Sequence, residues 1–313
     1  MRILLRKNMD RRKFLSVAGA VAVGAAVSDI PAGAKSSIPS KRPNKGAKGH
    51  FSLTQLASVT DTIGNSYILK TSKGSIIVMD GGKKTEVDKF RKYIEEAGNK
   101  VKAWFISHLH NDHHGVLNEI LKSPKGMEIE TIYHSRFPKD LINSEPSTRD
   151  AYELYGRLSD IKDTNVVDLH RTGRVIDIDG VKITVLGVTN PEITTNPYNN
   201  SSLILRVEDD SKSVVFLGDA GKECGDKVLA AYPELLNCDY LQVAHHGQSG
   251  CDERFYKTIK FKACLWPTPS WVWDPSKRPD LTFLNTMDTR RWMDEIGITE
   301  HHVTCLEGDF TLE

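Results

Sequence analysis

The segment of residues 105–115, Phe-Ile-Ser-His-Leu-His-Asn-Asp-His-His-Gly, places five metal-binding side chains within seven positions, directly after an apolar run. These side chains are His108, His110, Asp112, His113 and His114. Imidazole and carboxylate are ligands of borderline ions such as zinc, and alternating ligands on an extended loop can converge on one ion. A His-x-His-x-acid-His pattern has a chance of roughly 2 in a thousand in a chain of this composition. We therefore predict a metal site at the end of a strand.

The first 34 residues are typical of an export signal. Residues 10–15, Asp-Arg-Arg-Lys-Phe-Leu, precede a weakly apolar stretch, and residues 32–34, Ala-Gly-Ala, form a small-x-small cleavage site. The alternative is a membrane anchor, but residues 14–27 are shorter than the roughly 20 residues that cross a bilayer. We expect residues 1–34 to be a twin-arginine-type signal. The mature protein would be periplasmic or extracellular, with no stable membrane span after cleavage.

Composition changes along the chain. Residues 35–50 are rich in Pro, Gly, Ser and Lys and are predicted to be a linker, so the folded domain spans residues 51–313. That domain contains 31 basic and 39 acidic residues. A net acidic surface repels a polyanion, so sequence-specific nucleic-acid binding is not expected and a small-molecule or ester substrate is favoured. The five cysteines include no Cys-x-x-Cys pair, which argues against a thiolate zinc site.

Chemically active residues stand at the ends of predicted strands. Strands are expected over residues 65–70, 75–80, 101–107, 130–134, 181–186, 202–207, 213–217 and 240–244, and near the C-terminus over 303–306. Helices are expected over residues 86–97, 117–121, 148–161, 227–236 and 281–296. Four of the strands lead into Asp80, the His loop, Asp219 and His245. Functional groups at strand ends, on loops held by a sheet, are a common arrangement.

Four separated motifs together resemble the ordered motifs of the metallo-β-lactamase superfamily. They are Asp-Gly-Gly at 80–82, His-x-His-x-Asp-His at 108–113, Gly-Asp at 218–219 and His-His-Gly at 245–247. Within that superfamily, residues 199–205 and 241–247 look most like the hydrolase domain of competence DNA-uptake channels and the phosphorylcholine esterases. The resemblance covers residues 65–250 and implies an α/β fold, a four-layer αββα sandwich with a metal site at one edge.

Carried over by position, the resemblance implies roles for individual residues. His108 and His110 match ligands of a first ion, Asp112 and His113 match ligands of a second, Asp219 matches the bridging carboxylate, and His245 matches the last ligand of the second ion. Asp80 matches a residue that orients the His loop without touching metal. The implied cofactor is one or two Zn²⁺ ions, with Mn²⁺ or Fe as alternatives.

One position departs from the family pattern. The family carries a further His between the His loop and the bridging Asp, and residues 189–202 contain none. Asn200 is the candidate substitute, but a carboxamide is a poor zinc ligand, so the first ion is expected to be weakly held or absent.

The motif supports hydrolysis by a metal-bound hydroxide. We expect Asp112 to bind metal and orient that hydroxide, and His246 to protonate a leaving group or hold a substrate oxygen. His114 is expected to pack beside the ligands. The predicted function is an exported metal-dependent hydrolase of phosphodiesters or related esters. A lactone or β-lactam hydrolase of the same fold and a non-catalytic metal-binding module remain the alternatives.

Overall fold

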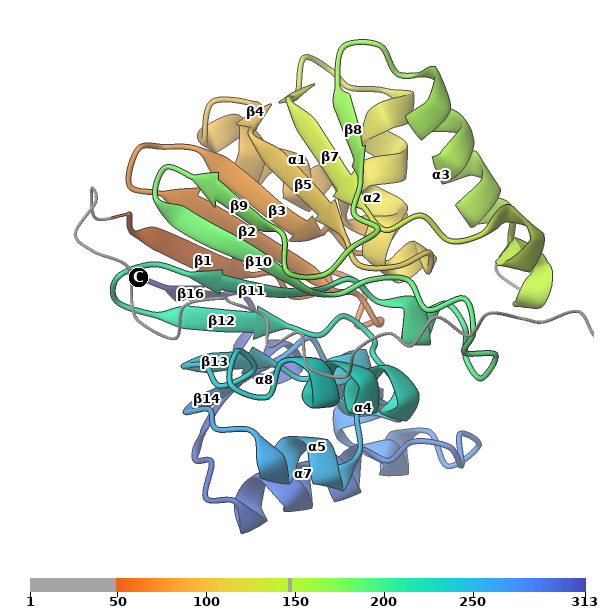
Figure 1. Cartoon of the computed structure of the whole chain (residues 1–313), viewed down its shortest axis with the longest axis vertical. Helices are drawn as coiled ribbons and strands as arrows, with labels where there is room; N and C mark the ends of the chain where they lie inside the picture. Colours follow the sequence, from red (N-terminus) through yellow and green to blue (C-terminus); the bar gives the residue numbers. More distant parts are fainter. Residues whose placement is uncertain (1–48, 146–147) are drawn as a thin grey trace, which may run out of the picture. The chain divides into compact units, whose positions relative to one another are not determined.

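Two β-sheets face each other, and helices cover their outer faces (Figure 1). This computed structural model describes residues 49–145 and 148–313. Three clusters of buried apolar side chains separate the layers: one between α1–α3 and the first sheet, one between the two sheets, and one between the second sheet and α4, α5 and α7. The predicted αββα sandwich is therefore confirmed. The predicted signal and nearly all of the predicted linker lie outside the described residues.

The first sheet has seven strands in the order β16-β1-β2-β3-β5-β7-β8. Strands β2 and β3 form the antiparallel hairpin that the sequence predicts, and β3, β5, β7 and β8 run parallel. A separate parallel pair is formed by β4 and β6. The bounds are β1 Phe51–Gln55, β2 Ser66–Thr71, β3 Ile76–Asp80, β4 Lys100–Val101, β5 Ala103–Ile106, β6 Glu128–Ile129, β7 Thr131–His134, β8 Asn165–Asp168 and β16 Phe310–Leu312.

The second sheet has seven strands in the order β15-β14-β13-β12-β11-β10-β9. Its antiparallel half, β9 to β12, is continued by the parallel strands β13, β14 and β15. The bounds are β9 Val175–Ile178, β10 Val181–Gly187, β11 Ile204–Glu208, β12 Ser213–Phe216, β13 Tyr240–Gln242, β14 Ala263–Trp266 and β15 Glu300–Val303.

Helices lie on the outer faces of both sheets (Figure 1). No helix in residues 49–145 and 148–313 combines the length and apolar character that a bilayer span requires. The α-helices are α1 Val87–Glu96, α2 Asn111–Lys122, α3 Thr148–Asp160, α4 Lys222–Ala231, α5 Glu253–Thr258, α6 Ser270–Trp273, α7 Thr286–Glu295 and α8 Thr304–Glu307, and the 3₁₀ helices are η1 Lys84–Glu86, η2 Lys139–Ser144, η3 Asn199–Ser201, η4 Ala244–Gly247 and η5 Pro275–Lys277.

Strand β5 shows why the central strands are continuous apolar runs. Successive side chains on a strand point to opposite faces of the sheet. Trp104 and Ile106 enter the cluster beneath α1 and α2, whereas Ala103 and Phe105 enter the cluster between the sheets. Because both faces are covered by apolar side chains, every position of this strand is apolar. The His loop follows directly after the carboxyl end of this buried strand.

Four predicted elements are wrong in their bounds or type. The helix expected over 117–121 is part of α2, which begins at Asn111. The helix expected over 227–236 is α4, which ends at Ala231 because Pro233 disfavours helical backbone at the residue before it. The helix expected over 281–296 begins only at Thr286. The strand expected over 303–306 is the end of β15 followed by the short helix α8.

Gln242 joins two strand ends that carry the candidate site. Its side chain is fully buried, and Oε1 accepts hydrogen bonds from the backbone N–H groups of Leu217 and Gly218, each at 2.7 Å. Its Nε2 donates to the carbonyl oxygens of Gly218 and Val243. This amide therefore fixes the backbone immediately before Asp219.

We predict that Gln242→Leu destabilises the protein by about 3 kcal/mol, because two buried N–H groups lose their acceptor. Urea denaturation of the variant and of the wild-type protein measures this difference. Lys70→Ala, a change at an exposed position on β2, serves as the control and is expected to change stability by less than about 0.5 kcal/mol. Equal denaturation midpoints for Gln242→Leu and the wild-type protein would contradict the structural role of this amide.

Candidate metal centre

The His loop is shorter than the sequence predicts. Extended backbone ends at His110, which is the N-cap of α2 with φ −79° and ψ 144°. Asp112 and His113 already lie in the first turn of α2, so the expectation of one extended loop through all the ligands is wrong. Helix and loop together still bring these side chains to one rim of the sandwich, where the chain segments after β12 and β13 also arrive.

One group of four buried side chains contains Asp112, His113, Asp219 and His246. His246 Nε2 lies 3.0 Å from Asp112 Oδ2 and 3.4 Å from Asp219 Oδ2. His113 Nε2 lies 3.2 Å from Asp219 Oδ1. The ligand atoms all lie within 4.8 Å of one another, as four ligands of a single ion require.

A second group contains His108, His110 and again Asp219. His108 Nε2 lies 3.0 Å from His110 Nδ1 and 3.8 Å from Asp219 Oδ2. Asp219 thus belongs to both groups, and it is only 2% exposed. A carboxylate placed between two such groups can bridge two cations.

Hydrogen bonds on the outer side of the imidazole rings fix which nitrogen faces inward. His113 Nδ1 lies 2.8 Å from Asp80 Oδ2, and His246 Nδ1 lies 3.0 Å from the carbonyl oxygen of Pro267. Because each acceptor requires a proton on Nδ1, Nε2 is the nitrogen that faces Asp112 or Asp219, and it offers its lone pair to a metal ion when the ring is neutral.

These inner nitrogens are suited to a cation. His113 Nε2 and Asp219 Oδ1 are buried and have no hydrogen-bond partner among the described residues. Lone pairs and carboxylate oxygens at such short separations repel one another unless a proton or a metal ion lies between them. The donor set of imidazole nitrogen and carboxylate oxygen fits a divalent ion such as Zn²⁺.

The pKa values of the imidazoles and carboxylates in the first group also indicate that positive charge is stabilised there. Burial disfavours protonation of His113, but the Asp219, Asp80 and Asp112 carboxylates outweigh it and raise the pKa of His113 well above its usual value. Burial also opposes protonation of His246, while Asp219 and Asp112 raise its pKa to about 9. The pKa of Asp219 is held well below its usual value because the neighbouring imidazoles outweigh burial. Asp112 and Asp219 are therefore ionised, and their charge favours either protons on the facing imidazoles or a metal ion in their place.

Asp80 orients the His loop through hydrogen bonds with Ser107 and His113. Its carboxylate accepts hydrogen bonds from Ser107 N at 2.7 Å, from Ser107 Oγ at 2.8 Å and from Asn65 Nδ2 at 2.8 Å, besides the contact with His113. It belongs to neither group of candidate ligands. This is the geometry of a residue that positions ligands without binding metal.

The imidazole that lies among the candidate ligands is that of His246, whereas the sequence prediction chose His245. Both residues have left-handed backbone, with φ 52° and 56°, in the turn η4. The ring of His246 is fully buried and enters the four-residue group, whereas His245 lies at its edge, with Nε2 3.8 Å from Asp219 Oδ2. The sequence prediction placed the ligand at the strand end, but β13 ends at Gln242, and the turn that follows directs the second imidazole inward.

Asn200, the predicted substitute for the absent His, faces away from both groups. Its Oδ1 accepts from the backbone N–H of Cys224 in the first turn of α4, and its Nδ2 donates to the carbonyl oxygen of Thr195. The neighbouring Asn199 is the amide that reaches the site: its Nδ2 lies 3.2 Å from His245 Nε2, and its Oδ1 is buried without a partner among the described residues. Nothing in the Asn-Asn pair distinguishes the two from sequence.

His114 is a packed imidazole. It is fully buried, and its Nε2 lies 3.1 Å from the carbonyl oxygen of Leu109. Burial lowers its pKa to about 4, so the ring is neutral at pH 7. It is in neither group of candidate ligands.

Three residues that contact the site have no sequence signal. Ser107 Oγ lies 3.0 Å from Nδ1 of both His108 and His113, and Ser202 Oγ accepts from the backbone N–H of Asp219 at 3.0 Å. Glu145 Oε2 lies 2.7 Å from His110 Nε2. Ser202 and Glu145 reach the site only through the tertiary fold, whereas Ser107 directly precedes His108 in the chain.

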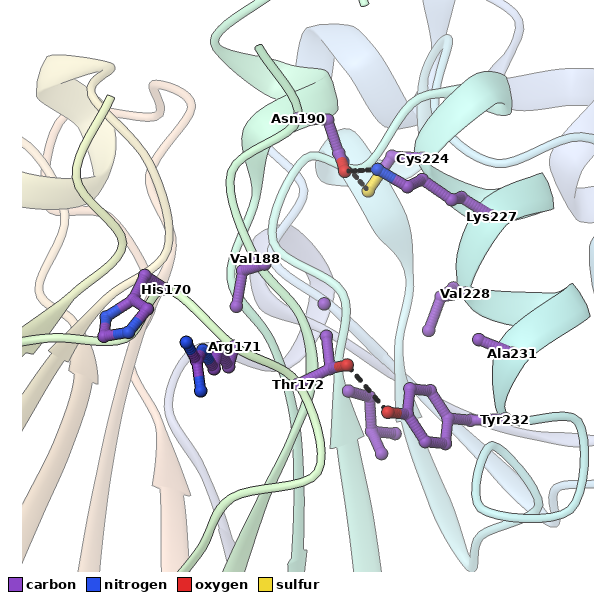
Figure 2. A pocket seen from close by; sticks show the side chains of 12 residues that line it. His170, Arg171, Thr172, Val188, Asn190, Cys224, Lys227, Val228, Ala231 and Tyr232 are labelled. Atoms are coloured by element: carbon purple, nitrogen blue, oxygen red, sulfur yellow. Dashed lines mark hydrogen bonds between the residues drawn. The ribbon is translucent and has the colours of Figure 1, made fainter. Parts of the chain in front are cut away.

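A pocket of about 370 Å³ lies elsewhere, between α4 and the loop before β9 (Figure 2). Hydrogen bonds between Lys227 and Asn190 and between Tyr232 and Thr172 lie at its two ends. None of the candidate metal ligands lines it. This pocket is therefore separate from the two groups of candidate metal ligands.

Known proteins share both the motifs and the fold. The family described as the metallo-beta-lactamase superfamily matches residues 59–250. ComE operon protein 3 of Bacillus subtilis (strain 168) is 27% identical over 164 residues, which cover 52% of this chain and 19% of that protein. The chain therefore matches about a fifth of that relative's length.

Among solved structures, the metallo-beta-lactamase fold protein YhfI from Bacillus subtilis superposes with a TM-score of 0.54 and 16% identity, covering 84% of this chain and 100% of that one. CmlA, a diiron β-hydroxylase from Streptomyces venezuelae, gives a TM-score of 0.55 and 12% identity, covering 87% of this chain and 55% of that one. At these identities the similarity shows the fold alone.

We predict that His246→Ala loses one of the two divalent metal ions that the ligand groups can hold, because it removes a ligand from the four-residue group. His245→Ala is the matched control, since it removes the adjacent imidazole, and it is expected to keep both ions. Metal content measured by mass spectrometry after gel filtration decides between them. The assignment fails if His245→Ala loses the ion and His246→Ala retains it.

Proposed function

Because the chain belongs to the metallo-β-lactamase superfamily, we propose that it is a metal-dependent hydrolase acting on phosphodiesters or related esters. The observation that carries the proposal is the position of Asp219, whose buried carboxylate is common to two groups of inward-facing imidazole and carboxylate ligands. Asp112, His113 and His246 would hold one divalent ion, and His108 and His110 would hold the other.

Zinc is the proposed ion because neutral imidazole and carboxylate are its usual nitrogen and oxygen ligands, and Mn²⁺ or Fe would accept the same set. A pair of such ions supplies a water of lowered pKa and neutralises charge that develops on the substrate. The chain's own contribution is a buried, preorganised set of ligands fixed by Asp80, Ser107 and Pro267.

His245 is the proposed acid–base residue. Its side chain is 19% exposed, and its Nδ1 donates to the carbonyl oxygen of Ser249 at 3.1 Å, which leaves Nε2 directed at Asn199 and Asp219. Burial lowers the pKa of His245 despite the nearby Asp219. A partly exposed imidazole with a lone pair on Nε2 can accept a proton from the attacking water and pass that proton to a leaving group. The sequence assigned this role to His246, whose Nε2 instead lies among the ligands.

The choice of a phosphodiester or related ester rests on motif resemblance. Residues 199–205 and 241–247 look like the hydrolase domain of competence DNA-uptake channels and the phosphorylcholine esterases, and the ligand set lacks the additional His of lactam-hydrolysing relatives. The net acidic domain favours a small substrate over a long polyanion.

We predict that the purified, zinc-loaded protein hydrolyses bis-p-nitrophenyl phosphate, and that His110→Ala reduces the rate at least roughly 100-fold through loss of metal. His245→Ala is expected to reduce the rate while retaining metal, because it removes a proton-transfer group rather than a ligand. His170→Ala, an exposed imidazole in the separate pocket (Figure 2), is the control and should leave the rate unchanged.

Equal activity of the wild-type protein and His110→Ala would overturn the enzymatic proposal. Turnover of nitrocefin or of a lactone, without turnover of the phosphodiester, would indicate a lactam or lactone hydrolase. Two bound ions with no turnover of any of the three substrates would indicate a metal-binding module.

We also propose that the protein is exported through the twin-arginine-type signal in residues 1–34. Replacing Arg11 and Arg12 by Lys is expected to retain the full-length chain in the cytoplasm, because the pathway reads the arginine pair. Cell fractionation with immunoblotting measures this, and Lys13→Arg is the matched control. A mutant chain that still leaves the cytoplasm and is shortened near Lys35 would contradict the proposal.

A further inference from the structure

The two candidate ion positions have unequal ligand sets. The position formed by Asp112, His113, Asp219 and His246 has four buried groups, whereas the described residues give the other position only His108, His110 and Asp219. An ion with three protein ligands of this kind depends strongly on how well each one is oriented. The weaker position is therefore where a supporting residue has most effect.

We propose that Glu145 positions His110 as a ligand of the first ion and so compensates for the imidazole that this chain lacks. The inference rests on the proposed two-ion centre and names a residue that no motif contains. Glu145 follows η2 and lies 35 residues from His110 in the sequence. Its role is positioning, because it acts on the ion only through the imidazole.

The contact between the two side chains selects one form of the ring. Glu145 Oε2 accepts a hydrogen bond from His110 Nε2 at 2.7 Å, which places the proton on Nε2 and leaves the Nδ1 lone pair free. That Nδ1 lies 3.0 Å from His108 Nε2, within the group that includes Asp219. A carboxylate behind an imidazole also makes the opposite nitrogen a stronger donor to metal.

Glu145 is itself held in place. Its side chain is only 15% exposed, and Oε1 accepts from the backbone N–H of Tyr198 at 2.9 Å. Tyr198 is fully buried, donates from its hydroxyl to the carbonyl oxygen of Ile142 at 2.6 Å and contacts the His110 ring at a centroid distance of 5.3 Å. The carboxylate thus ties α2 to the turn that carries Asn199.

The same arrangement occurs at the other ion position. There, Asp80 accepts from His113 Nδ1 at 2.8 Å. The remaining ligand imidazoles, His108 and His246, have Ser107 Oγ and a backbone carbonyl as their outer partners. Each proposed ion therefore has one imidazole backed by a carboxylate, and Glu145 is to His110 what Asp80 is to His113.

The test is a Zn²⁺ titration of the metal-free full-length protein, followed by calorimetry with a chelator competitor. Glu145→Ala is expected to weaken the weaker site by roughly 10- to 100-fold and to leave the tighter site unchanged. Glu145→Gln, which keeps one oxygen acceptor, is expected to give a smaller loss. In a His110→Ala background, Glu145→Ala should cause no further loss, because its effect passes through that imidazole.

Glu153→Ala is the matched control, because it removes an acidic side chain from the neighbouring α3 without contact with the site. Unchanged affinity at both sites in Glu145→Ala would overturn the proposal. Equal weakening of both sites, with a lower melting temperature of the metal-free protein, would show a general structural role and would also overturn it. The readout needs no turnover, so a protein that binds two ions without hydrolysing any ester still decides the role of Glu145.

Discussion

Asp219 is a carboxylate almost without solvent contact that stays ionised, and the rest of the site is arranged around its charge. Burying such an anion costs free energy unless cations or several donors surround it. Here the surrounding groups are imidazoles from both sheets, whose inner nitrogens face Asp219 and supply positive charge by holding a proton or a metal ion. Ligand atoms that all lie within 4.8 Å of one another, in two groups that share Asp219, favour a metal centre over a structural ion pair.

The strand ends were predictable from sequence because two physical rules act there together. Strands covered on both faces must be continuously apolar, so Ile76–Asp80, Ala103–Ile106 and Ser213–Phe216 are visible as runs. Polar groups that follow such runs are placed at the rim by the sheet itself. The resemblance to the superfamily, and the prediction of the sandwich that it implies, rests on the four motifs at residues 80–82, 108–113, 218–219 and 245–247.

Other features depend on tertiary contacts that a sequence does not display. The choice between His245 and His246 is made by two consecutive left-handed residues, and the choice between Asn199 and Asn200 by the backbone N–H of Cys224 that the second amide caps. Glu145 reaches His110 from a segment with no motif of its own. The end of α4 is a local feature instead, because Pro233 disfavours helical backbone at the residue before it.

The ligands are divided between the two sheets: the segment after β5 provides the His loop, while those after β12 and β13 provide Asp219 and His246. Neither half of the sandwich carries a complete set, so tight cation capture has to wait until the halves have docked. Metal binding would then require the complete tertiary structure, so that only fully folded molecules hold the ions tightly. A protein exported in the folded state would then leave the cytoplasm with its metal already bound.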